Sequence, residues 1–144
     1  MKHSLDSQSR EALVKYRLQR ALDTLEDAKS ELHRGSYNSC MNRLYYSCFY
    51  AVLAILIHRG VEAKSHAGVR GQFSLQIIKP GLLDKKFNTF YYQVFQSRIQ
   101  GDYDDFFTTD QEIAERFVEE GEVFIKALQE LIENIPPIEL QAEI

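Results

Sequence analysis

The residues of this sequence that could act on a phosphate are an arginine with its near neighbours and one distant histidine. Arg98 is followed at short spacing by Asp102 and Tyr103, and His66 lies in the first turn of a predicted short helix. A guanidinium holds a phosphate through two parallel hydrogen bonds and stabilises developing negative charge. An imidazole accepts or donates a proton near neutral pH, although His66 could equally pack over the preceding loop. These four residues form our candidate catalytic group.

Three further cations, Lys64, Arg70 and Arg43, are candidates for binding phosphate or nucleic acid. Residues 58–98 hold seven Lys/Arg and two Asp/Glu, whereas residues 99–144 hold two and thirteen. A basic middle suits a phosphate-bearing partner. The same charge distribution could also pair two copies of the chain or two partners. It could equally be no more than a solvated acidic helix beside a few surface lysines.

Motifs for other chemistries are absent from the sequence. We find no glycine-rich phosphate loop, no cluster of metal ligands and no nucleophile elbow, and we expect no metal and no cofactor. Cys40 and Cys48 are eight residues apart on one predicted helix, about 12 Å along its axis, and cannot form a disulfide. The first residues lack the apolar core of a signal peptide, so we expect a cytoplasmic protein.

Arg98 ends the apolar stripe of a predicted helix. The stripe follows helical spacing through Phe87, Tyr91, Val94 and Arg98. A guanidinium at such a position is costly unless it is paired or faces a cleft. Asp102 is four residues further on and could pair with it if the helix continues past Gly101. Two interpretations stay open: a phosphate-binding cleft at Arg98, or an internal polar staple of Arg98, Asp102 and Tyr103.

The element that must position these residues is a central helix predicted over residues 36–59. From Leu44 to Ile57 only Ser47 is polar, so this helix has no face fit for water and must be enclosed. The run is shorter than the roughly 20 residues of a membrane span, and we expect no membrane association. Other helices are predicted over residues 9–34, after a Ser65 cap, after an Asp84 cap, and from a Thr109 capping box to Pro136.

The sequence therefore predicts an all-α protein. The expected architecture is a single compact antiparallel bundle of four to five helices over residues 9–135, with tails at 1–8 and 136–144. Gly121, within the stripe of the last helix, is the predicted point of close helix approach.

An ordered set of motifs in this chain is similar to that of a known family. The motifs are Tyr16-Arg17 with Arg20-Ala21, Gly35-Ser36-Tyr37, Asn42-Arg43-Leu44-Tyr45-Tyr46 with Phe49-Tyr50-Ala51, Ser65-His66-Ala67-Gly68-Val69 with Phe73, and Arg98-x-x-Gly101-Asp102-Tyr103. From about Tyr16 to Leu131 the chain resembles the HEPN domain, in particular its short stand-alone prokaryotic branch.

The resemblance implies a helical bundle that usually forms a homodimer. Such proteins are often encoded beside a minimal nucleotidyltransferase, the two acting as toxin and antitoxin. Active members are metal-independent ribonucleases with an Arg, a spacer of four to six residues and a His, and two copies form a composite cleft. In one branch the antitoxin adenylylates a tyrosine close to that His.

This chain departs from the ribonuclease signature. Tyr103 stands five residues after Arg98, and no histidine follows in the chain. Tyrosine, with a reference pKa near 10, is a poor acid and base at neutral pH, so Tyr103 cannot take over the role of the histidine. His66 could supply the missing imidazole if the fold or a second copy brings it near Arg98. Whether the chain is an enzyme is therefore left open. We expect a toxin-like or accessory HEPN protein that binds RNA or nucleotide phosphate at Arg98, with Tyr103 as a candidate for modification. The alternative is a non-catalytic dimerisation or interaction module.

Overall fold

The computed structural model describes residues 6–103 and 109–138, with only the backbone described for residues 99–103. Within that part of the chain there is no strand. The elements are α1 (Ser7–His33), α2 (Tyr37–His58), α3 (His66–Phe73), the π-helical turn η1 (Ser74–Ile78), α4 (Lys85–Tyr103) and α5 (Gln111–Asn134). The all-α prediction is confirmed.

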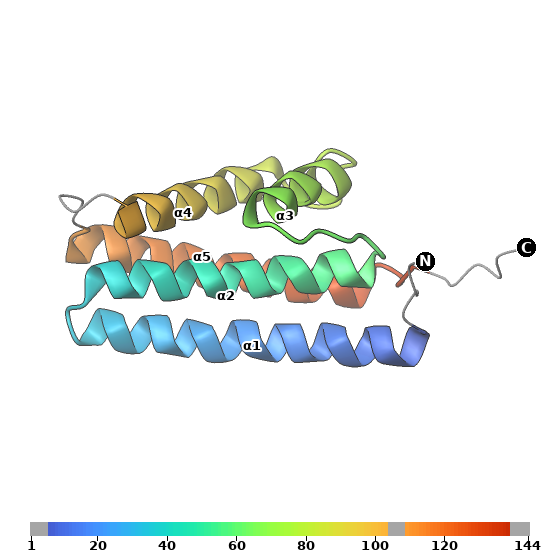
Figure 1. Ribbon diagram of the computed structural model, residues 1–144, viewed down its shortest axis with the longest axis horizontal. Helices are drawn as coiled ribbons and strands as arrows, with labels where there is room; N and C mark the ends of the chain where they lie inside the picture. Colours follow the sequence, from blue (N-terminus) through green and yellow to red (C-terminus); the bar gives the residue numbers. More distant parts are fainter. Residues whose placement is uncertain (1–5, 104–108, 139–144) are drawn as a thin grey trace, which may run out of the picture.

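Four long helices make the bundle, and α3 with η1 lies beside α4 at one end of it (Figure 1). α1 and α4 run in one direction along the long axis, and α2 and α5 run in the other. α2 packs against α1, α5, α4 and α3, so it occupies the centre that its apolar run predicted.

Burial inside the protein explains the composition of α2. By length and apolarity it is the one helix in the described residues that could cross a bilayer. Eleven of its 22 residues are buried, among them Leu44, Tyr45 and Ile55, which are fully enclosed. The neighbouring helices that cover these side chains account for the apolar composition of α2 without a membrane.

The start of α5 corrects one predicted cap. Asp110, and not Thr109, caps this helix, because the Asp110 carboxylate accepts a hydrogen bond from the backbone N–H of Ile113 at 2.9 Å. Thr109 is buried instead, and its backbone N–H donates to Asn38 Oδ1 at 3.1 Å, which ties Thr109 to the start of α2. The tertiary contact thus displaces Thr109 from the capping position.

The other two predicted caps are confirmed. Ser65 accepts from the backbone N–H of Gly68 at 2.9 Å, and Asp84 accepts from that of Lys86 at 2.8 Å. At the start of α2, Ser36 holds the N-cap position, but its side chain makes no cap hydrogen bond.

The predicted close approach at Gly121 joins α5 to α2. A Cβ atom built on Gly121 would lie 2.5 Å from Leu44 Cδ1, and Leu44 is fully buried. Overpacking a core costs about 1–3 kcal/mol, whereas alanine gains about 1 kcal/mol over glycine in helix propensity. Gly121→Ala is therefore expected to lower the free energy of unfolding by about 1 kcal/mol, measured by denaturant titration.

Gly71→Ala is the matched control for this prediction. Gly71 lies in α3, and a Cβ there would meet nothing within 4 Å. Only the propensity gain remains, so this variant is expected to be more stable by about 0.5–1 kcal/mol. Equal responses at the two glycines would contradict a close contact between α5 and α2.

Candidate functional site

Two adjacent tyrosines of α2 bring Arg98 and His66 together. Arg98, from α4, donates through Nη2 to Tyr46 Oη at 3.2 Å, and its Cζ lies 5.6 Å from the ring centroids of both Tyr45 and Tyr46. His66, from the first turn of α3, has its Nδ1 only 2.6 Å from Tyr45 Oη. Residues from three helices thus converge where α2, α3 and α4 meet.

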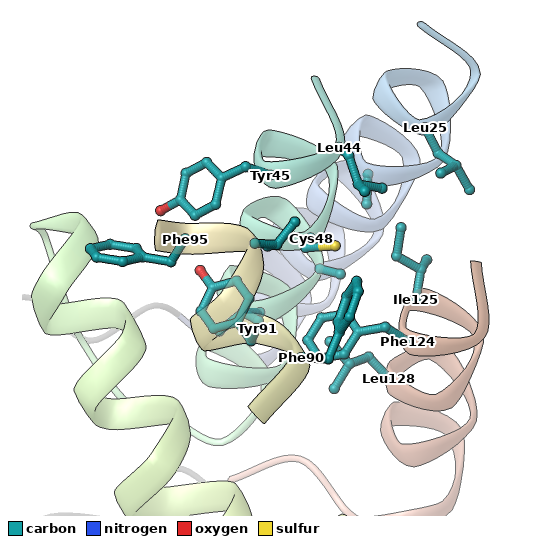
Figure 2. Packing of buried hydrophobic residues seen from close by; sticks show 14 of the residues in the cluster. Leu25, Leu44, Tyr45, Cys48, Phe90, Tyr91, Phe95, Phe124, Ile125 and Leu128 are labelled. Atoms are coloured by element: carbon teal, nitrogen blue, oxygen red, sulfur yellow. The ribbon is translucent and has the colours of Figure 1, made fainter. Parts of the chain in front are cut away.

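The floor of this site is aromatic. Tyr45 packs against Tyr91 and Phe95 of α4, with ring centroids 6.2 and 5.8 Å away, and Figure 2 shows the three rings together. The ring of His66 stacks on Phe49 at 4.5 Å. The half-buried imidazole is therefore held by a stack on one side and a hydrogen bond on the other.

The electrostatics keep both partners of the short hydrogen bond neutral. Burial, and secondarily the charge of Arg98, lower the pKa of His66 below its ordinary value. Burial raises the pKa of Tyr45 to about 12. At neutral pH the imidazole is therefore uncharged and the tyrosine keeps its proton.

The acid–base character of the two groups favours one direction for the bond between Tyr45 Oη and His66 Nδ1. A phenol O–H is a stronger hydrogen-bond donor than an imidazole N–H, and an unprotonated imidazole nitrogen is a stronger acceptor than a phenol oxygen. Tyr45 Oη–H therefore donates to Nδ1 of His66, which leaves the ring hydrogen on Nε2. In this form Nε2–H is a donor that suits a phosphate oxygen, and it is not a base.

Tyr45→Phe is expected to lower the pKa of His66 further. Protonation of Nδ1 would reverse the bond, because Tyr45 Oη can accept from the charged N–H, and a charge-assisted bond is stronger than the neutral one. Loss of the hydroxyl therefore costs the imidazolium more than the neutral ring. An NMR titration of the histidine ring protons measures this shift. Tyr50→Phe is the control, because its hydroxyl accepts from Arg20 Nη2 at 3.0 Å. An unchanged or higher His66 pKa in Tyr45→Phe would contradict this expectation.

The lowered pKa of His66 in the folded protein also predicts how the stability depends on pH. Because the pKa of His66 is lower in the folded state, the unfolded chain binds its proton first as pH falls through about 6.5. The stability of the wild type relative to His66→Gln should therefore decline as pH is lowered below about 6.5 and be constant above it. Denaturant titrations of both proteins at several pH values measure the difference. A difference that grows on acidification would mean that His66 gains a proton on folding.

A surface of alternating arginines and aromatic rings extends the site along α2. Arg43 Cζ lies 5.2 Å from the Tyr46 centroid, and Arg20 Cζ lies 4.8 Å from the Tyr50 centroid. The Tyr46 and Tyr50 rings are themselves 6.3 Å apart. We call this the arginine–tyrosine surface and define it by Arg20, Arg43, Tyr46, Phe49, Tyr50, His66 and Arg98.

Part of this surface was predicted from the sequence. Arg98, His66 and Arg43 were predicted site residues, and the structure brings them to the Tyr45–Tyr46 pair. Arg20 and Tyr50 were noted only as parts of the family motifs and were given no role in binding. The available signal was the four-residue spacing of Tyr46 and Tyr50 on the less buried side of α2.

Two of the predicted phosphate ligands lie apart from that pair. Arg70 packs on α4, with its Cζ 5.0 Å from the Tyr92 centroid and 5.1 Å from that of Phe95. Lys64 is exposed ahead of α3. Neither contacts the Tyr45–Tyr46 pair in the interactions that the structure gives them.

The predicted staple falls outside the described side chains. α4 continues past Gly101 to Tyr103, as the pairing of Arg98 with Asp102 requires. The side chains of Asp102 and Tyr103 are not among those described. The described residues include no group of three or more His, Cys, Asp or Glu that could hold a metal ion.

Comparisons with known proteins give one matching family model and several relatives. The family model of the HEPN domain matches residues 14–131. A UPF0332 protein of Thermotoga maritima is 32% identical over 126 residues, which are 88% of this chain and 96% of the relative. A protein of Methanocaldococcus jannaschii named "Putative toxin" is 29% identical over 108 residues, 75% of this chain and 74% of the relative. A second of that name from the same organism is 27% identical, covering 80% and 85%.

Proposed function

The chain belongs to the HEPN domain family, and on this basis we propose that it is a toxin-like protein that binds single-stranded RNA on the arginine–tyrosine surface. The observation that carries the proposal is the meeting of Arg98 and His66 at the Tyr45–Tyr46 pair. Relatives that carry the name "Putative toxin" support the toxin-like part.

The phosphate would be held by Arg98 and His66. The Arg98 guanidinium is half-buried and lies by two rings, so its orientation is set before a ligand arrives. The Nε2–H of neutral His66 supplies a second donor. A phosphodiester offers several oxygen acceptors, and this pair of one charged and one neutral donor suits it.

The bases would stack on the aromatic members of the surface. Tyr46, Phe49 and Tyr50 are each partly exposed. Stacking on such rings contributes about 1–3 kcal/mol per base and tolerates any sequence. Arg20 and Arg43 lie over two of these rings and would neutralise the adjoining phosphates.

Charge would keep RNA away from α5. Residues 111–134 hold seven Asp/Glu and two Lys/Arg. A polyanion is repelled by that helix and attracted to the arginines of α1, α2 and α4. The same asymmetry would let a second copy or an antitoxin partner engage the acidic side.

We propose binding without rapid cleavage by the single chain. Attack of a ribose 2′-hydroxyl on the phosphate needs a general base, and His66 in its assigned tautomer presents a hydrogen at Nε2. Tyr103 replaces the histidine of the active members. The family resemblance implies two partners, a second copy of the chain and a minimal nucleotidyltransferase. We propose Tyr103 as the residue that this enzyme would modify, and the cytoplasm as the compartment in which they meet.

Fluorescence anisotropy with a labelled single-stranded RNA tests this function. The dissociation constant should rise with salt, with a log–log slope of about 0.7 for each phosphate contacted. RNA incubated with the protein and EDTA should remain intact on a gel. Absence of binding at low salt, or binding indifferent to salt, would rule out the proposed RNA surface.

A further inference from the structure

A groove of about 550 Å³ lies between α4 and α5, and no residue of the arginine–tyrosine surface lines it. Phe87 and Phe90 form its apolar wall on α4, and their ring centroids lie 6.0 and 5.4 Å from that of the buried Phe124. Val123 lines the groove from α5. Phe87 is half-buried and Val123 is exposed, so both helices leave apolar surface open to solvent in the groove.

The α5 side of the groove also carries two adjacent carboxylates, those of Glu119 and Glu120. Within the described residues, neither carboxylate forms a hydrogen bond or an ion pair. The nearby Glu122, by contrast, pairs with Lys29 of α1 at 3.1 Å. Two unpaired negative charges beside exposed apolar surface favour a partner that brings cations and apolar side chains together.

The length of the groove suits a helix. Along α4 its lining residues extend from Lys86 to Gln93, a rise of about 10 Å along the helix axis. An amphipathic helix that lies in a groove presents anchors at i, i+3 or i+4, and i+7, which span the same rise. The Nζ of Lys86 lies 5.1 Å from the centroid of the Phe87 ring, and this contact leaves the two carboxylates available to a partner.

We propose that this groove docks an amphipathic helix of a partner protein. The apolar side chains of that helix cover Phe87, Phe90 and Val123, and its lysines or arginines face Glu119 and Glu120. The two carboxylates repel RNA, so the groove serves a protein and not a nucleic acid. Since the arginine–tyrosine surface shares no residue with the groove, this inference does not depend on the proposed RNA binding.

Isothermal titration calorimetry and amide NMR of the full chain test the groove with a synthetic peptide. The probe is a capped peptide of about 15 residues, built from alanine, leucine and lysine, with leucines at i, i+3 and i+7 on one face. A scrambled peptide of the same composition and a peptide with glutamate in place of each lysine are the controls. We expect the probe to bind more tightly than either control and to shift the amides of Thr89, Gln93 and Val123.

Variants of exposed residues locate the binding. Val123→Gln and the double variant Glu119→Gln/Glu120→Gln should each weaken probe binding about fivefold, through loss of an apolar contact and of two ion pairs at an exposed rim. Glu130→Gln removes an exposed carboxylate of α5 outside the groove and should leave the affinity unchanged. All of these side chains are exposed, so the variants should remain folded.

Several results would overturn the proposal. They are equal affinity for the scrambled peptide, unchanged affinity in both groove variants, amide shifts centred outside the groove, and no probe binding at about 1 mM. A shift of the Thr89, Gln93 and Val123 amides when the protein alone is concentrated would also overturn it, because the groove would then hold a second copy of the chain.

Discussion

Phe124→Ala is expected to lower the free energy of unfolding by about 3–5 kcal/mol. Phe124 is fully buried on α5. Its ring centroid lies 5.4–6.0 Å from four others, those of Phe73, Phe87, Phe90 and Tyr91. Figure 2 shows it facing the rings of α4 across the core. Its removal would leave a cavity at the point where α3 and α4 are fixed to α5.

Denaturant titration followed by circular dichroism measures this loss. The matched control is Val123→Ala at the neighbouring position, where the side chain is 57% exposed. That substitution should change stability by about 0.5 kcal/mol or less. A loss below about 1 kcal/mol in Phe124→Ala would mean that α4 is fixed to the bundle by other contacts.

Arg98→Ala is expected to weaken RNA binding about 10- to 100-fold. The substitution removes the charged donor that lies between Tyr45 and Tyr46, and His66 alone cannot replace its charge. Fluorescence anisotropy gives the ratio of affinities. Arg116→Ala is the matched control, since Arg116 is an exposed arginine on the acidic helix α5 and should be dispensable.

Thermal unfolding of Arg98→Ala distinguishes a phosphate-binding Arg98 from an Arg98 that belongs to an internal polar staple. If Arg98 binds the phosphate, Arg98→Ala should bind weakly while remaining folded at the assay temperature. A staple predicts a loss of several kcal/mol in stability, because a charged partner would be left unpaired. Wild-type affinity in a folded Arg98→Ala protein would remove Arg98 from the RNA site.

The helices could be predicted from the sequence because burial leaves a periodic trace. The apolar run from Leu44 to Ile57 predicted a helix enclosed on all sides, and α2 does lie at the centre of the bundle. Full enclosure was wrong on one side, where Tyr46, Phe49 and Tyr50 stay partly exposed. Gly121 was expected at a close approach and lies against Leu44. These features depend on residue spacing along a single helix, which the sequence records directly.

The side-chain partners could not be predicted, because they depend on where separate helices meet. Nothing in the spacing shows that the hydroxyl of Tyr45 faces His66 across 21 positions. Arg98 was assigned a partner on its own helix, yet it also contacts Tyr46 of α2. Thr109 had the residue type of a cap, but its contact with Asn38 placed the next residue there.

Photocrosslinking identifies the residues that touch RNA and so tests whether RNA binds on the arginine–tyrosine surface. A single-stranded RNA carrying 4-thiouridine is irradiated with the full-length protein, digested with trypsin and analysed by mass spectrometry. We expect crosslinks in the tryptic peptide of residues 44–59, which contains Tyr46, Phe49 and Tyr50. Crosslinks confined to the peptide of residues 117–126 on α5 would contradict it.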